Sequence, residues 1–140
     1  AGNSARYVTS VCAGSLILAG AGLLDGYRSA CHWLSRDQLA PLGAIPVADR
    51  IVVDRNRVSG GGVTAGIDFA FQLAAELCGE EVARRLQLLL EYDPQPPFDT
   101  SERTASPEAL AAIRLAAKPM LDARREAGER ARARLNAGRR

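Results

Sequence analysis

The chain has 140 residues, of which 47% are hydrophobic and 24% charged, and its formal net charge is +2. These values fit one globular domain with a hydrophobic core and argue against a disordered chain. Glycines interrupt the apolar stretch at residues 16–24, which is far short of the ~20 residues that a membrane-spanning helix needs. An odd number of cysteines favours a reducing compartment over a disulfide framework, so we predict a cytoplasmic protein without a membrane partner.

The first predicted strand, residues 7–11, runs directly into a predicted helix over residues 13–23. Cys12 stands at the junction and is followed by small residues: Ala13, Gly14 and Ser15. A sharp strand-to-helix turn holds the junction side chain in a strained, exposed position, and small neighbours let the backbone pass close by. The helix start, with the N–H of Ala13, favours negative charge there. The pattern indicates a nucleophilic Cys12, and a buried structural cysteine is the alternative.

Short β-favouring and helix-favouring runs alternate along the rest of the chain. The further predicted strands cover residues 27–31, 50–54 and 57–59. The further predicted helices cover residues 35–39, 64–78, 80–91 and 106–136. A turn at Arg55 and Asn56 lets the last strand either pair back on its predecessor or continue the sheet. Caps are expected from the side chains of Thr64 and Ser106. This order predicts an α/β fold with a mostly parallel sheet.

Three segments each follow a predicted strand: Cys12, His32 and the glycine run at residues 60–62. Ligands bind at the carboxyl ends of the strands in parallel sheets, so we expect these segments to converge on one crevice. His32 is the only histidine of the chain. It either takes part in chemistry near Cys12 or is a partly buried ring that hydrogen-bonds a loop carbonyl, and the sequence leaves both roles open.

Basic residues are concentrated at the C-terminal end of the chain. They are Lys118, Arg124, Arg125, Arg130, Arg132, Arg134, Arg139 and Arg140. No aromatic residue interleaves the arginines and no helix-turn-helix pattern follows them. A solvated helix face is therefore favoured, and nucleic acid is not expected as a partner.

Five segments resemble, in the same order, the ThiJ/PfpI family of the class I glutamine amidotransferase-like superfamily. They are residues 10–19, 22–26, 30–33, 51–56 and 59–70. Residues 39–46, residues 87–98 and the single closing helix resemble the isocyanide hydratases of that family in particular. The resemblance covers nearly the whole chain. It implies a flavodoxin-like three-layer sandwich, a cysteine nucleophile at Cys12 and a homodimer.

Members of this family normally carry a further segment before the nucleophile strand, with the first strands of the sheet and an acidic residue that works beside the cysteine. The resemblance thus predicts that residues 1–99 are the C-terminal portion of a ThiJ/PfpI-like α/β domain whose N-terminal strands are missing. Residues 100–140 would be a linker and the closing helix of the same domain. Ala13 stands where isocyanide hydratases usually have a threonine, and Cys31 replaces a threonine that often precedes the histidine.

The resemblance implies a lyase that adds water to an isocyanide to give an N-substituted formamide, provided that the missing segment supplies the acid. Cys12, Ala13 and His32 would serve catalysis. Gly61, Gly62 and Val63 would bind the small-molecule substrate. No cofactor or metal is expected, because the cysteines and the histidine lack paired ligand spacing. Asp68, in the first turns of a predicted helix, fits a dipole or capping group better than the missing acid.

Other functions use the same residues. A redox-sensing or ligand-binding ThiJ/PfpI-like module would need the reactive thiol without turnover, and the loss of the threonine at position 13 mildly favours it. A glyoxalase or deglycase would direct the thiolate at a small dicarbonyl compound. The ligand domain of an AraC-type regulator is disfavoured, because too few residues follow Asp99 for a helix-turn-helix domain.

Overall fold

The structure is a computed structural model that describes residues 2–138. Its strands are β1 (Val8–Val11), β2 (Arg28–Ser29), β3 (Ile45–Pro46), β4 (Ile51–Asp54) and β5 (Arg57–Gly60). Its α-helices are α1 (Gly14–Gly20), α2 (Ala65–Cys78), α3 (Glu80–Leu89) and α4 (Pro107–Ala137). Two 3₁₀ helices are η1 (Gly2–Ser4) and η2 (Arg36–Leu42). Every predicted strand and helix is therefore present, and the predicted short helix near residue 35 is a 3₁₀ helix.

The main sheet is mixed and has the strand order β1-β5-β4. β1 and β5 are parallel, whereas β4 and β5 form an antiparallel hairpin. Arg55 adopts a left-handed φ of 55° in the two-residue turn, a geometry that such hairpins require. Residues 57–60 thus pair back on β4, and a second, two-stranded sheet joins β2 and β3 in parallel. Within residues 2–138, β1 pairs only with β5 and lies at an edge of its sheet.

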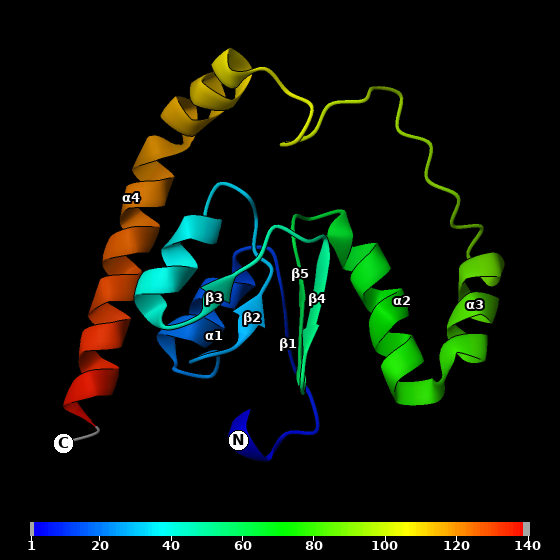
Figure 1. The fold of residues 1–140 in the computed structure, drawn as a ribbon, viewed down its shortest axis with the longest axis horizontal. Coiled ribbons are helices and arrows are strands. Elements are labelled where there is room, and N and C mark those ends of the chain that lie inside the picture. Colours follow the sequence, from blue (N-terminus) through cyan, green and yellow to red (C-terminus); the bar gives the residue numbers. More distant parts are fainter. Residues whose placement is uncertain (1, 139–140) are drawn as a thin grey trace.

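Helices lie on both sides of the main sheet, with α1, η2 and α4 on one side and α2 and α3 on the other (Figure 1). This arrangement is α/β, as predicted. A buried cluster fills the space between α1, η2 and the smaller sheet: Ala19, Leu24, Cys31, Leu39, Leu42 and Ala44. α4 covers α1 closely, because a Cβ on Gly20 would lie 3.2 Å from the Cβ of Ala131. The finer flavodoxin-like assignment stays a prediction.

Local sequence signals explain the ends of the longer helices. The Ser106 hydroxyl caps α4 by accepting a hydrogen bond from the Ala109 N–H at 3.2 Å, and Pro107 occupies the first helical position. Gly79, with φ of 92°, separates α2 from α3 and allows the chain to reverse. Thr64 stands at the start of α2 as predicted, but its side chain makes no capping hydrogen bond.

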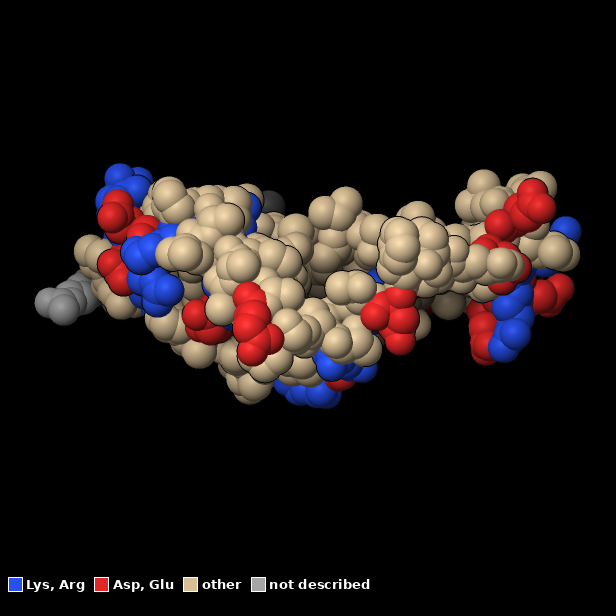
Figure 2. Space-filling model, turned by 90° about the horizontal axis from the view of Figure 1, so that it is seen from above, with Lys and Arg blue, Asp and Glu red and all other residues tan. Residues whose placement is uncertain are grey.

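Basic side chains of α4 are used within the chain. Arg132 donates to Asp25 at 2.7 Å, and Arg124 donates to the Ser35 hydroxyl at 3.1 Å. Lys118 forms an exposed pair one helical turn away on α4 itself. In Figure 2, acidic and basic side chains lie side by side at both ends of the elongated molecule. The predicted solvated face holds for Lys118, Arg125, Arg130 and Arg134, which are exposed, whereas Arg124 and Arg132 are half-buried. No helix within residues 2–138 is both long enough and apolar enough to span a bilayer.

A chain of buried hydroxyls joins α1, β1 and β5 to the segment after β2. The Ser15 hydroxyl donates to the Ala30 carbonyl at 2.7 Å and lies 2.8 Å from the Ser10 hydroxyl. The Ser59 hydroxyl accepts from the Ala30 N–H at 2.8 Å. Ala30 is fully buried, so these side chains satisfy backbone groups that no neighbouring strand pairs. They fix the position of the segment that carries Cys31 and His32.

We expect Ser59→Ala to lower the free energy of unfolding by about 1–3 kcal/mol, because it leaves the buried Ala30 N–H without an acceptor. Urea denaturation measures this change. Thr9→Ala is the matched control, since Thr9 is exposed on the neighbouring strand and should change stability by less than about 0.5 kcal/mol. Equal stabilities for the two variants would contradict the role given to the buried hydroxyl.

Candidate active site

Cys12 lies at the turn between β1 and α1 with a left-handed φ of 60°. Such a conformation costs a non-glycine residue on the order of 1–3 kcal/mol, and it persists only where the surroundings enforce it. The enforcing contact is the Cys12 N–H, which donates to the Gly60 carbonyl at 3.1 Å. The side chain is half-buried. This geometry matches the strained strand-to-helix turn that the sequence predicts.

Ala13 is the residue at the N-terminal cap of α1, with helical backbone angles of φ −71° and ψ −7°. The first N–H groups of a helix have no acceptor within it, so those of Ala13 and the two following residues are directed out of its N-terminal end. This end of α1 begins directly behind Cys12. Negative charge that develops on a group bound to Cys12 would be stabilised there.

His32 is half-buried on the segment after β2. Its Nδ1 accepts a hydrogen bond from the Leu34 N–H at 3.3 Å, so in the neutral ring the proton lies on Nε2. The ring edge with Cδ2 faces Gly62, where an added Cβ would lie 3.6 Å away. Burial lowers the pKa of His32, and the Arg124 guanidinium lowers it further. The ring is therefore neutral near pH 7.

The glycine run after β5 lies beside the turn at Cys12. Gly60 accepts from the Cys12 N–H, and Gly61 donates to the Arg50 carbonyl at 2.9 Å. Gly62 then accepts from the Ala65 N–H at 3.0 Å, at the start of α2. Val63 is largely exposed. The structure thus places the glycine run next to Cys12, and it places His32 next to the same glycine run. Within the described part of the chain, no hydrogen bond joins His32 to Cys12.

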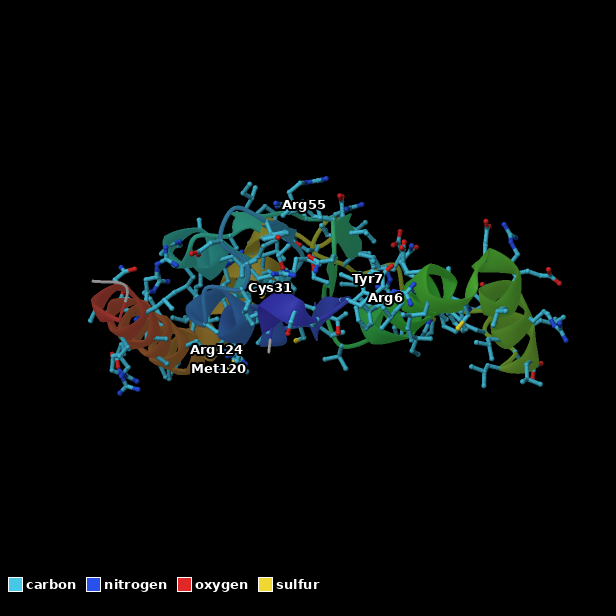
Figure 3. All side chains as sticks on the ribbon, turned by 90° about the horizontal axis from the view of Figure 1, so that it is seen from below. Arg6, Tyr7, Cys31, Arg55, Met120 and Arg124 are labelled. Atoms are coloured by element: carbon cyan, nitrogen blue, oxygen red, sulfur yellow. The ribbon has the colours of Figure 1, made fainter. Side chains whose placement is uncertain are left out.

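Cys31 is a second thiol close to Cys12. It is buried near the centre of the molecule, and Arg124 reaches toward the same region from α4 (Figure 3). Burial raises the pKa of the Cys31 thiol to about 11, and the charge of Cys12 adds to the shift. The backbone of His32 opposes this shift through a hydrogen bond. The Cys31 thiol is thus protonated near pH 7, and it lines the site without competing with Cys12 as a nucleophile.

Asp68, on α2, is a carboxylate held by an arginine and a tyrosine. Asp68 accepts from the Tyr92 hydroxyl at 2.5 Å and from Arg50. Burial raises the pKa of Asp68, but these two hydrogen bonds outweigh it and the net pKa is lowered. Asp68 lies in the first turn of α2, where the predicted dipole role applies, and it also joins α2 to two loops as an ionised partner. Among residues 2–138, no three histidine, cysteine, aspartate or glutamate side chains gather as a metal site would need.

The burial of Cys31 predicts its reactivity toward alkylating agents. At pH 8, with a pKa of about 11, only about one Cys31 side chain in a thousand is thiolate, the form that reacts. Iodoacetamide should therefore label the exposed Cys78 long before Cys31, and labelling of Cys31 should accelerate as the pH rises toward 11. Peptide mass spectrometry follows both sites, and equal labelling rates at pH 8 would contradict the burial of Cys31.

Comparisons with known proteins connect this geometry to a family. The model of the DJ-1/PfpI family matches residues 1–76. Isonitrile hydratase from Pseudomonas putida is 55% identical over 133 residues, which are 94% of this chain and 58% of that protein. The HTH-type transcriptional regulator GbdR from Pseudomonas aeruginosa is 35% identical over 91 residues, 63% of this chain and 24% of that protein.

Solved structures agree in fold. A ThiJ/PfpI family protein from Pseudomonas syringae has a TM-score of 0.74 and 48% identity, and the match covers 94% of this chain and 52% of that one. DJ-1 from Toxoplasma gondii, at 23% identity, shares the fold with a TM-score of 0.59 over 66% of this chain and 50% of that one. The chain thus spans roughly half the length of the hydratase and of these structures. With its strained Cys12 turn and the family match over more than half of its residues, the chain belongs to the DJ-1/PfpI family.

Proposed function

We propose that the protein is an isocyanide hydratase in which Cys12 is the nucleophile and the product is an N-substituted formamide. One observation carries the proposal. A cysteine is held at φ 60° where β1 turns into α1, in a chain that is 55% identical to an isonitrile hydratase. That similarity extends over 133 residues, whereas the similarity to the regulator GbdR extends over 91. The longer match favours the enzyme over a regulatory ligand domain.

The reaction begins with attack of the Cys12 thiolate on the terminal carbon of the isocyanide, which forms a carbon–sulfur bond. That carbon takes up a proton and becomes a thioimidate, with a carbon–nitrogen double bond. Water adds to the carbon while the nitrogen gains a proton. The carbon–sulfur bond then breaks, the thiolate is restored and the hydroxyl proton is lost, so that one isocyanide and one water give one formamide.

The described residues support these steps in different ways. The N-terminal end of α1, with the N–H of Ala13, stabilises negative charge on the attacked group. The glycines at 61 and 62 let a substrate approach the backbone beside Cys12, and Val63 borders them. Neutral His32 can donate a hydrogen bond from Nε2 to the nitrogen or to the incoming water.

The acid that protonates the carbon is proposed to come from outside residues 2–138. The acidic side chains near the site are each close to an arginine: Glu102 pairs with Arg36, Asp68 pairs with Arg50, and Asp49 lies 3.9 Å from Arg28. The hydrogen bonds from Arg36 lower the pKa of Glu102, so it holds no proton near pH 7. The similar proteins are longer than this chain, and a segment equivalent to their additional length is the proposed source.

Localisation and assembly are proposed as well. A cytoplasmic protein fits the odd cysteine count. A homodimer fits the apolar surface of α3 and its C-terminal end, where Leu88, Leu89 and Leu90 are more than half exposed. A domain of this size seldom leaves such a surface in water.

Replacement of the nucleophile tests the proposed function. Cys12→Ala should lower the rate of formamide production by at least about a hundredfold, because no other thiol can take its place. Chromatographic detection of the formamide measures this rate. Cys78→Ala removes an exposed thiol and is the matched control, for which we expect unchanged activity. A measurable rate of formamide production that is the same for Cys12→Ala and the unmodified protein would refute the proposal.

The non-catalytic alternative has its own observation, the similarity to a transcriptional regulator. A redox-sensing module would show peroxide oxidation at Cys12 without any turnover of isocyanide. A glyoxalase or deglycase would instead consume a small dicarbonyl compound through the same cysteine. Assay of one preparation with an isocyanide, with methylglyoxal and with peroxide separates the three functions.

A further inference from the structure

A cleft of about 310 Å³ opens beside the glycine run that follows β5. Its lining includes Gly61 and Gly62, which we call its floor, together with Cys31 and Trp33. Arg36, Asp49 and Arg50 add charged side chains to the lining. Ser101, Glu102 and Arg103, which belong to a segment far away in the sequence, also line the cleft. This volume is at the lower end of the ~300–1,000 Å³ typical of small-molecule sites.

The position of the cleft relative to Cys12 follows from two contacts. Its floor begins one residue after Gly60, whose carbonyl holds the Cys12 N–H at 3.1 Å. Its lining includes Cys31, which follows Ala30, and the Ala30 carbonyl accepts a hydrogen bond at 2.7 Å from Ser15 in the first turn of the helix behind Cys12. A molecule joined to Cys12 at one end could therefore extend along the glycines into the cleft.

The far side of the cleft is a strap, which we define as residues 99–105. In Figure 1 the chain between α3 and α4 crosses above the strands and dips toward the sheet before α4 begins. The dip is fixed by Glu102, which accepts two hydrogen bonds from Arg36, one of them at 2.9 Å. Arg103 adds a hydrogen bond to the Ala48 carbonyl at 3.2 Å. These contacts join the strap to η2 and to the loop before β4.

Within the strap a tight turn keeps its own shape. The Thr104 hydroxyl accepts from the Ser101 N–H at 2.8 Å and donates to the Asp99 carbonyl at 3.2 Å. The charges of Arg36 and Glu102 are partly shielded, with side chains 21% and 31% exposed. A bidentate pair of this kind fixes geometry more firmly than a single exposed ion pair. The strap is thus a preformed wall.

Trp33 contributes an indole ring to the lining of the cleft. The Arg114 guanidinium lies over its indole at 4.9 Å from the ring centroid, and the His32 ring stacks at 6.2 Å. Because these contacts already hold the indole in place, the side chain loses little conformational entropy when a ligand binds against it. The glycine floor adds no side chains, so a compact ring could lie between the indole and the strap.

We propose that this cleft receives the substituent on the isocyanide nitrogen, that it selects compact aromatic groups, and that Arg36 and Glu102 are positioning residues that hold its strap wall. The inference rests on the proposed function and adds the class of substrate to it. Trp33 determines specificity through contact with the substituent. Arg36 and Glu102 act only through the strap.

The test compares two isocyanides in the Glu102→Gln variant, which keeps the size of the side chain but removes the charge that holds Arg36. For benzyl isocyanide we expect KM to rise about five- to tenfold, because the wall that contacts the ring is loosened. For methyl isocyanide, which is too short to reach the strap, we expect less than about a twofold change in KM. Arg84→Gln, which breaks an exposed ion pair on α3, is the matched control and should change neither value.

A second readout does not depend on turnover. We expect both iodoacetamide and its N-benzyl derivative to alkylate Cys12, and peptide mass spectrometry gives the ratio of their rates. Glu102→Gln and Trp33→Ala should each lower the rate of the benzyl reagent relative to the small one by at least about threefold. If no formamide forms but the variants change this ratio, the proposed function is wrong, whereas the binding of a ring in the cleft is supported. If neither KM nor the alkylation ratio depends on the size of the reagent, the cleft proposal is overturned.

Discussion

The parallel pairing of β1 with β5 is the constraint on which the rest of the site depends. Its register continues beyond Val11 and Gly60, so that the Gly60 carbonyl accepts the Cys12 N–H at the point where β1 turns into α1. That hydrogen bond holds Cys12 in a left-handed conformation that costs on the order of 1–3 kcal/mol. The same pairing sets the glycine run beside the thiol and directs the N-terminal end of α1 toward it. A small number of backbone contacts thus determines where chemistry can occur.

Side chains then join segments that the backbone leaves unpaired. Ser59 and Ser15 hold Ala30, and with it the segment of Cys31 and His32, against the main sheet. Arg132 and Arg124 fasten α4 over α1 and η2. Each of these hydrogen bonds is partly shielded from water, where a polar contact contributes more than it does on the surface. The site is therefore built by polar contacts around a modest apolar cluster.

Much of this arrangement could be predicted from the sequence, because local signals mark it. Small residues after Cys12 predict the strained turn, and Ser106 with Pro107 predicts the start of α4. The strap could not be predicted, because the pair of Arg36 and Glu102 joins residues 66 positions apart and neither residue differs locally from an ordinary surface charge. The hairpin of β4 and β5 was left open, since the turn at Arg55 lacks the glycine that usually marks one. The hydrogen bonds of Asp68 could not be predicted either, because one of them comes from Tyr92 in the loop after α3, 24 residues away.

The central claim is that Cys12 attacks the carbon of an isocyanide. The most direct measurement is the mass of the Cys12 peptide after the protein is mixed with benzyl isocyanide and quenched in acid within milliseconds. The account predicts a peptide heavier by the mass of one isocyanide, which appears before the formamide and disappears as the formamide accumulates. Formamide production with an unmodified Cys12 peptide at every time point, or an adduct found on Cys78 alone, would contradict the account.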